Sequence, residues 1–400
     1  MAGSMHHRIV VVGGGTAGIS VAARLRRAGQ DDIALVEPSE HHFYQPLWTL
    51  VGGGAASAES TRRKEAGVMP RGVRWIQDRA AEIDPDAQRV TTGTGATLGY
   101  DFLVVAPGIQ LDWDGIPGVP ETLGRDGVSS NYRYDLAPRT WEQLQQVRGG
   151  TALFTQPVGP IKCGGAPQKI MYLAADHFRR RGILDQVDVV FATTSPSIFG
   201  VPEFAEVLEG VVARYGIDTR YEHELVEVEP GRREAVLLSV TTGEKTTVPY
   251  DFLHVVPPMS APDFLKHSPL AVPDDPKGWV HVDDHTLRHV RYPNVFSLGD
   301  AASSPNGKTG AAVRKQAPVV VTNLLDAMAG REPSARYDGY TSCPLVTGYG
   351  KLVLAEFDYT DRPHPTIPLL NTFKERYDMW LLKKYGLPFL YWNLMLKGIA

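Results

Sequence analysis

The feature that most constrains this chain is a glycine-rich turn close to its N-terminus. Arg8 to Val12 has the short apolar pattern of a buried strand, and the run Gly-Gly-Gly-Thr-Ala-Gly at 13–18 follows directly. A helical pattern comes next, and a second expected strand, Ile33 to Val36, ends at Glu37. An acidic residue about 20 positions beyond such a turn is typical of a dinucleotide-binding unit of the Rossmann type. The sequence therefore predicts an α/β fold that begins with a dinucleotide site.

Each part of this turn has a physical role in holding a dinucleotide. Gly13 allows the tight turn, Gly15 lets the backbone approach a pyrophosphate, and Gly18 lets the helix pack closely on the strand. The start of the helix, at Thr16, offers free N–H groups and the positive end of the helix dipole to phosphates. Glu37 would accept hydrogen bonds from ribose hydroxyls. We expect all five residues to contact the cofactor.

Two later segments favour FAD over NAD as this cofactor. The strand pattern at 100–105 ends in a small-residue turn at Gly108, and a second pattern at 294–298 ends in Gly299-Asp300. In flavoproteins with two dinucleotide domains, similar turns leave the first domain and hold the ribityl chain through an aspartate. A helix beginning near residue 308 would stabilise negative charge on the reduced flavin. The remaining expected FAD contacts are Gln45, Ala80, Lys308, Thr309 and Gly310.

A second α/β unit begins near residue 150, but it lacks what a nicotinamide cofactor needs. Strand patterns at 151–155 and 186–193 flank a helix, yet the intervening turn at 156–167 has no phosphate fingerprint. The second strand ends in Thr193-Thr194-Ser195 instead of an acid for ribose. A reductase that uses NADH would need both features. The turn carries a cysteine, Cys163, in place of the fingerprint.

The fold class that follows is α/β, with two Rossmann-like dinucleotide-binding domains as in flavoproteins similar to glutathione reductase. The second domain is inserted in the first, and an amphipathic membrane-contact region ends the chain. The predicted boundaries are 1–115 and 285–335 for the FAD-binding domain, 116–284 for the second domain, and 336–400 for the C-terminal region.

The chain has two cysteines, Cys163 and Cys343, and both are expected in loops. Cys163 precedes a helix and is flanked by Lys162 and Lys169, a setting that favours the thiolate. Gly164 and Gly165 would remove side chains where a flat flavin approaches. No paired Cys/His spacing predicts a metal site. Either the cysteines form a redox pair across the flavin, or they are two unconnected buried residues.

Composition excludes some partners and favours others. The formal net charge is −4 and no basic stripe occurs, so nucleic acid is not an expected partner. No stretch has the roughly 18 apolar residues of a membrane-spanning helix, and no secretory signal is expected. The tail, at 372–384 and, after a break at Gly386, at 387–397, is instead amphipathic and fits an interfacial anchor. The alternative is a helix pair that packs on the core or on a dimer partner.

Several segments resemble the sulfide:quinone oxidoreductase family, in particular the subgroup of the animal mitochondrial enzyme and its bacterial relatives. The similarity covers nearly the whole chain, and the two cysteine segments are the most specific. Some members carry a third cysteine that is missing here, so the resemblance implies noncovalent FAD. The matching segments are 41–46, 158–169, 337–349, 355–359 and 388–393.

The resemblance also implies a chemistry and its partners. Cys163 and Cys343 would rest as a disulfide or trisulfide, with Cys343 carrying the persulfide and Cys163 facing the flavin. Sulfite, glutathione, coenzyme A or sulfide would accept the sulfane sulfur, and ubiquinone or menaquinone would take the electrons. Phe357 and Tyr359 are candidate quinone contacts. The expected location is the cytoplasmic face of a bacterial inner membrane, as a peripheral protein.

Other functions compete with this interpretation. An NADH:quinone oxidoreductase of the same fold would need the missing fingerprint, and a sulfide dehydrogenase feeding a cytochrome would need an export signal. A flavin-bound redox sensor without turnover remains a third alternative. Lys169 and Glu203 are candidates for a general acid or base, although a solvated or structural role is favoured for both.

Overall fold

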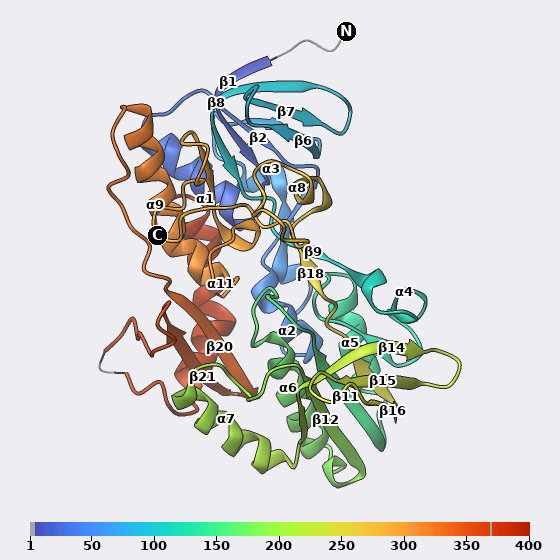
Figure 1. Cartoon of the computed structure of the whole chain (residues 1–400). Helices are drawn as coiled ribbons and strands as arrows, with labels where there is room; N and C mark the ends of the chain where they lie inside the picture. Colours follow the sequence, from blue (N-terminus) through green and yellow to red (C-terminus); the bar gives the residue numbers. More distant parts are fainter. Residues whose placement is uncertain (1–4, 306, 369) are drawn as a thin grey trace.

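The computed structural model describes residues 5–305, 307–368 and 370–400 (Figure 1). Strand β1 (Met5–Val12) lies in the middle of the first sheet, in parallel with β2 (Ile33–Val36) and β8 (Thr97–Val105). Its apolar residues are buried, as expected for a parallel strand covered on both faces. The sheet is completed by β5 (Arg74–Ile76), which pairs with β2, and by the antiparallel strands β6 (Ala80–Asp84) and β7 (Arg89–Thr92).

The chain returns to this sheet after a long excursion. Strand β19 (Val295–Ser297) pairs in parallel with β8, and helix α9 (Gly310–Met328) packs against α1 (Thr16–Arg27). The expected strands at 8–12, 33–36, 100–105 and 294–298 are all present, within a few residues of their predicted ends. Residues from both parts of the chain therefore build one sheet.

The intervening residues form a second parallel sheet with its own core. Its order is β10 (Val128–Ser129), β17 (Phe252–His254), β11 (Gly150–Gln156), β12 (Val187–Thr193) and β13 (Asp218–Tyr221). Helices α5 (Leu136–Leu144), α6 (Ala166–Arg180) and α7 (Pro202–Tyr215) accompany it, together with the antiparallel strands β14 (His223–Glu229), β15 (Glu234–Ser239) and β16 (Lys245–Pro249). The first turn of α6 follows Cys163 directly.

Short elements connect these units. They are β3 (His41–Phe43), α2 (Trp48–Gly52), β4 (Arg62–Lys64), α3 (Glu65–Val68), β9 (Gln110–Leu111), α4 (Val119–Thr122), β18 (Met259–Ser260) and α8 (Asp263–Lys266). The pairs β3–β4 and β9–β18 are antiparallel.

A C-terminal hairpin, β20 (Thr341–Gly348) and β21 (Lys351–Phe357), packs against α6 (Figure 1). Cys343 lies inside β20 and pairs with Ala355. The prediction that Cys343 is in a loop is therefore wrong, because Pro344 is accommodated in a two-stranded hairpin. Proline is tolerated in such edge strands.

The tail differs from its prediction at two points. Its helical stretch begins at Tyr377 and continues through α10 (Tyr377–Leu381), a π-turn at 382–386, α11 (Leu387–Leu390) and a second π-turn at 391–395. Residues 371–376 are irregular instead of helical, and the Arg376 N–H donates to the Leu352 carbonyl of β21. The predicted break at Gly386 is absent, since Gly386 has helical dihedrals. Across the described residues, every helix falls short of the length and hydrophobicity needed to cross a bilayer.

Candidate active site

The two cysteines meet although 180 residues separate them in sequence. Their Sγ atoms are 3.7 Å apart. Cys163 has a positive φ of 55°, and its N–H donates to the Lys308 carbonyl at 2.8 Å. This hydrogen bond joins the cysteine turn to the segment that begins α9, while β20 brings Cys343 in from the other side. The pair therefore sits where the two α/β units and the C-terminal hairpin meet.

Gly165 explains how the two sulfurs approach so closely. A Cβ atom at Gly165 would collide with the Cys343 Sγ and with the Leu345 side chain. A Cβ at Gly164 would meet nothing within 4 Å. We expected both glycines to clear space for a flavin. For Gly165, the missing side chain is instead explained by close packing against Cys343.

Lys169 is the cationic partner of Cys163. Its Nζ donates to the Cys163 Sγ at 3.0 Å, and the residue is only 2% exposed. We expected Lys169 to have a solvated or a structural role, and the solvated alternative is wrong, because the side chain is buried on the first turn of α6 and donates to the sulfur. Lys162 instead donates to the Gln45 Oε1 at 2.8 Å and to the Tyr132 carbonyl. Glu203 is exposed, as a solvated residue would be.

The surroundings of the pair separate the pKa values of the two thiols. Hydrogen bonding from Cys343 and the Lys169 ammonium hold the pKa of Cys163 well below its ordinary value, against the opposing effect of burial. The interaction with Cys163, together with burial, raises the pKa of Cys343. The reduced pair therefore holds one negative charge, on Cys163, next to Lys169. A thiolate placed in this way is a good leaving group and electron donor.

The glycine-rich turn has the geometry of a phosphate cradle. Gly13 has φ 100°, and a Cβ there would clash with the backbone of Ala106. A Cβ at Gly18 would clash with the Gly13 carbonyl. At Gly15 the same atom would meet nothing within 4 Å. The first and last glycines are thus needed for packing, and the middle one faces open space, as predicted for a ligand that approaches the backbone.

Glu37, Gly108, Gly310 and Ala80 are further residues that we expect to contact the cofactor. Glu37 accepts hydrogen bonds from the N–H groups of Gly14 and Ser39 at 2.7 and 2.8 Å, so its carboxylate is fixed beside the turn. Gly108, with φ 81°, and Gly310 also face space in which a Cβ would have no neighbour within 4 Å. Ala80 is the first residue of β6 and is half-buried.

The start of α9 is preorganised by its own side chains. Thr309 caps the helix by accepting a hydrogen bond from the Ala312 N–H at 3.1 Å. The Lys308 Nζ donates to the carbonyls of Asp300 and Ala302, and it lies 4.0 Å from the Trp279 ring centroid. Burial raises the pKa of Asp300. The free N–H groups of this helix start can stabilise a developing negative charge.

The two candidate quinone contacts have packing partners. Phe357, at the end of β21, packs edge-on against Phe199 at 5.8 Å. The Tyr359 ring lies against Gly339, and its hydroxyl donates to the Asp284 carbonyl at 2.8 Å. Both contacts account for these residues as structural, so a role in quinone binding stays a prediction.

Several buried polar residues of the tail have no distinguishing signal in the sequence. The Tyr391 hydroxyl is 2.8 Å from the Thr16 Oγ1 and 2.6 Å from the His42 Nε2, which ties the tail to the glycine-rich turn. The Lys383 Nζ donates to the Pro46 carbonyl at 2.8 Å. Burial and the charge of Lys169 lower the pKa of Lys383 to about 7. In sequence it is indistinguishable from its neighbour Lys384.

Among the residues that the structure describes, no three His, Cys, Asp or Glu side chains gather as they would around a metal ion. The groups that can take part in chemistry are the sulfurs of Cys163 and Cys343 and the Lys169 ammonium group, together with a glycine-rich turn that can hold a dinucleotide.

Comparisons with known proteins agree with this geometry. The family described as pyridine nucleotide-disulphide oxidoreductase matches residues 7–148. The mitochondrial sulfide:quinone oxidoreductase of Mus musculus is 47% identical over 98% of this chain and 87% of its own length. That of Dictyostelium discoideum is 44% identical over 98% and 86%. The solved structure of the Aquifex aeolicus sulfide:quinone oxidoreductase superposes with a TM-score of 0.84 at 22% identity, covering 99% of this chain and 92% of that one.

Proposed function

Because this chain belongs to the sulfide:quinone oxidoreductase family, we propose that it oxidises sulfide at Cys163 and Cys343 and passes the electrons through FAD to a membrane quinone. The observation that carries this proposal is the pair of sulfurs 3.7 Å apart with the Lys169 ammonium 3.0 Å from one of them. A chain that only packed two cysteines would have no need to bury a lysine against one sulfur.

The sulfur chemistry starts from the oxidised pair. Sulfide attacks the Cys343 Sγ, so one S–S bond forms and the Cys163–Cys343 bond breaks. Cys343 then carries a persulfide, and Cys163 leaves as a thiolate that Lys169 stabilises. Starting from a trisulfide, the same attack on the Cys343 Sγ would release Cys163 as a persulfide anion, because the bridging sulfur stays on Cys163.

An acceptor then removes the sulfane sulfur from Cys343, and this acceptor is sulfite, glutathione, coenzyme A or a second sulfide. A thiolate on Cys163 and a thiol on Cys343 remain, and re-forming their S–S bond releases one proton and the two electrons that came from sulfide. FAD, when bound, supplies the two-electron acceptor and delivers these electrons to ubiquinone or menaquinone. The low pKa of Cys163 keeps this sulfur in the form that can give up electrons.

The residues present fit noncovalent FAD. Gly13, Gly15, Thr16, Gly18 and Glu37 would hold the adenosine and pyrophosphate, and Asp300 the ribityl chain. The α9 start at 308–310 would face the pyrimidine side of the ring, with Gln45, Ala80 and Gly108 as further contacts. Both cysteines belong to the sulfur pair, which leaves none to attach the flavin covalently.

The rival donor is NADH, and steady-state assays separate the two. We expect the purified protein with FAD to reduce a soluble quinone analogue when sulfide and sulfite are supplied. NADH should give no more than the background rate, because the turn after β11 has no phosphate fingerprint and β12 ends without an acid. Quinone reduction by NADH, with none from sulfide, would reject the proposal.

The C-terminal tail supports contact with a bilayer. Tyr385 and Phe389 are more than half exposed on a helical stretch whose other side is buried. They line a hollow of about 420 Å³ together with basic and aromatic neighbours, among them Arg63, Lys384 and Trp392. Exposed aromatics beside lysine and arginine are typical of a helix lying in the headgroup layer. The quinone would enter from this layer, with Phe357 and Tyr359 as candidate contacts.

We expect the protein to be attached peripherally to the cytoplasmic face of the bacterial inner membrane. Two of the relatives compared above are mitochondrial enzymes, and the Aquifex aeolicus enzyme is bacterial. Fractionation of cells that express the chain, followed by washing with salt and alkali, would test both the location and the mode of attachment.

Phe389→Glu tests the membrane contact. Burying a phenylalanine is worth about 1.5–3 kcal/mol, so we expect binding to lipid vesicles to fall by roughly ten- to a hundredfold. Turnover with a soluble quinone analogue should be unchanged. The matched control is Val240→Glu, which places the same charge at a residue 46% exposed on the second domain. Equal vesicle binding by both variants would remove the tail from the membrane contact.

A further inference from the structure

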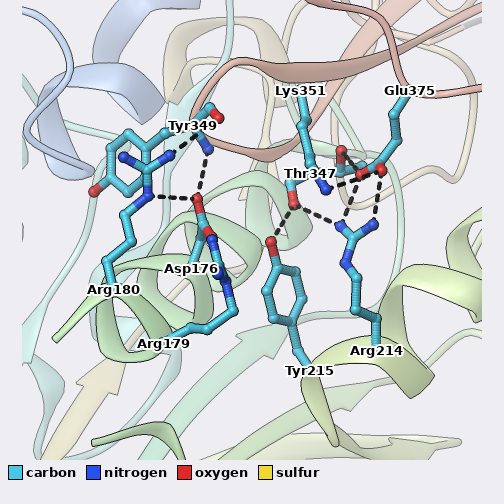
Figure 2. A network of polar contacts seen from close by, with 9 residues as sticks. All are labelled: Asp176, Arg179, Arg180, Arg214, Tyr215, Thr347, Tyr349, Lys351 and Glu375. Carbon is cyan, nitrogen blue, oxygen red and sulfur yellow. Dashed lines mark hydrogen bonds and ion pairs between the residues drawn. The ribbon is translucent and has the colours of Figure 1, made fainter. Parts of the chain in front are cut away.

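We propose that Asp176 is a positioning residue for the sulfur half-reaction. It fixes the hairpin, which carries Cys343, to helix α6, which follows Cys163. The inference rests on the proposed function, but its geometry is independent of that function. Figure 2 shows the polar network, here called the hairpin clamp, in which side chains of α6 and α7 bind residues at the β20–β21 turn. Its members are Asp176, Arg179, Arg180, Arg214, Tyr215, Thr347, Tyr349, Lys351 and Glu375.

Asp176 is the buried centre of one half of the clamp. Its side chain is 2% exposed, and its Oδ2 accepts from the Tyr349 backbone N–H at 2.9 Å. Arg179 and Arg180, one turn further along α6, donate to the same carboxylate at 2.7 and 3.1 Å. The Tyr349 N–H belongs to the hairpin turn, so this hydrogen bond joins α6 directly to the hairpin backbone, and Arg180 adds a bond to the Tyr349 carbonyl at 3.3 Å.

Glu375 holds the other side of the same turn. Arg214 of α7 donates to both of its carboxylate oxygens at 2.7 Å, and Lys351 lies 3.4 Å away. The Tyr215 hydroxyl, also from α7, donates to the Thr347 carbonyl at 3.0 Å. The turn is therefore fixed by two helices of the second domain, not by one.

The clamp lies at one end of the contact between α6 and β20. At the near end, Gly165 packs directly on the Cys343 sulfur; at the far end, Asp176 binds Tyr349. Between these points the helix spans about 16 Å, at 1.5 Å per residue. The strand spans about 20 Å, at 3.3 Å per residue. Helix and strand thus run side by side over nearly equal lengths and are fixed at both ends.

Fixing both ends sets the register of β20 on α6. A slip of one residue would move the Cys343 position by about 3.3 Å and turn its side chain to the opposite face. The β20–β21 ladder alone does not prevent such a slip on α6, because β21 would move together with the strand it pairs with. Gly348 permits the close approach: a Cβ there would lie 2.8 Å from the Tyr215 hydroxyl. The position of the Cys343 sulfur therefore depends on the clamp.

The contact that matters is the hydrogen bond, not the ion pairs. Arg179 and Arg180 are about half exposed, and such pairs contribute little. Asp176→Asn keeps an oxygen that can accept from the Tyr349 N–H, whereas Asp176→Ala leaves that N–H without its partner. The asparagine variant should therefore retain the positioning and the alanine variant should lose it.

The experiment measures the Cys163–Cys343 dithiol–disulfide equilibrium against glutathione redox buffers in the FAD-loaded protein. We expect Asp176→Ala to shift this equilibrium about tenfold toward the dithiol and to slow flavin reduction by sulfide about tenfold. Asp176→Asn should stay within about twofold of wild type in both. Reoxidation of the reduced flavin by a quinone analogue should be unchanged in all variants.

The matched control is Asp326→Ala. Asp326 is also a buried carboxylate that binds an arginine, Arg331, at 2.7 Å, but it lies near the end of α9, away from the hairpin clamp. It controls for lost stability. If Asp176→Ala lowers the melting temperature as Asp326→Ala does and leaves the thiol equilibrium at the wild-type value, the proposal is overturned. If Asp176→Ala does not fold, Tyr215→Phe carries the test, with an expected shift of about threefold; no shift would overturn the proposal.

The two proposals fail in different ways. If wild type is not reduced by sulfide, the proposed function fails, while the thiol equilibrium still reports whether Asp176 positions Cys343. If wild type is reduced by sulfide and Asp176→Ala behaves like Asp326→Ala in every measurement, only the positioning role fails.

Discussion

Replacing either cysteine with serine should slow sulfide-driven flavin reduction by roughly a thousandfold or more, the scale of loss when a covalent nucleophile is removed. A serine hydroxyl cannot form the S–S bond that sulfide must attack, and it cannot carry a persulfide. Cys163→Ser and Cys343→Ser should lose the reaction to a similar extent, because each removes one half of the same bond. Stopped-flow measurement of flavin absorbance after anaerobic mixing with sulfide gives the rates.

The controls for the cysteine variants come from the other half-reaction. Both variants should bind FAD at wild-type stoichiometry, and their chemically reduced flavin should be reoxidised by a quinone analogue at the wild-type rate. Flavin reduction at more than a tenth of the wild-type rate in both variants would exclude the pair as the point of electron entry. The flavin would then have to receive electrons from sulfide directly.

Lys169→Met should have the second largest effect, through the pKa of Cys163. An opposite charge within hydrogen-bonding distance shifts a pKa by about one to three units. Without Lys169 the pKa of Cys163 should move up toward its ordinary value of 9.0. Each unit reduces the thiolate about tenfold at pH below the new pKa. We therefore expect flavin reduction at neutral pH to be about ten- to a hundredfold slower.

The sign of the pH dependence tests the cause. In wild type the thiolate persists as the pH falls and is lost only below the lowered pKa of Cys163. In Lys169→Met it should be lost at higher pH, so that activity recovers in alkaline buffer. Thiolate absorbance in the ultraviolet and flavin reduction should follow the same curve. Lys266→Met, which removes a lysine paired with Asp263, should leave both curves unchanged. A loss in Lys169→Met that is equal at all pH values would contradict the electrostatic role.

The parts of this site that sequence predicts well depend on short spacing. The glycine turn at 13–18, the strand Ile33–Val36 and the helix after Cys163 each follow from a local pattern. The structure has these elements at nearly the predicted positions. Backbone conformation at such turns is determined by neighbours within a few residues, so a local pattern is sufficient.

The parts that sequence misses depend on contacts between distant segments. Burial of Lys169 is decided by β20, which arrives more than 150 residues later, and the reason for Gly165 is the Cys343 sulfur. The tail was expected to break at Gly386, yet Tyr391 and its neighbours pack on the N-terminal unit and hold the helix together. Local propensity was overridden by tertiary packing in each case.

One single-turnover measurement tests the central claim, that electrons from sulfide enter through the sulfur pair. The FAD-loaded protein is mixed anaerobically with one equivalent each of sulfide and sulfite, so that the sulfane sulfur has an acceptor, and a short-chain quinone follows after the flavin absorbance has settled. We predict rapid bleaching, one equivalent of thiosulfate, and full reoxidation by quinone. Bleaching by NADH with none by sulfide, or bleaching by sulfide that persists when both cysteines are serine, would contradict the account.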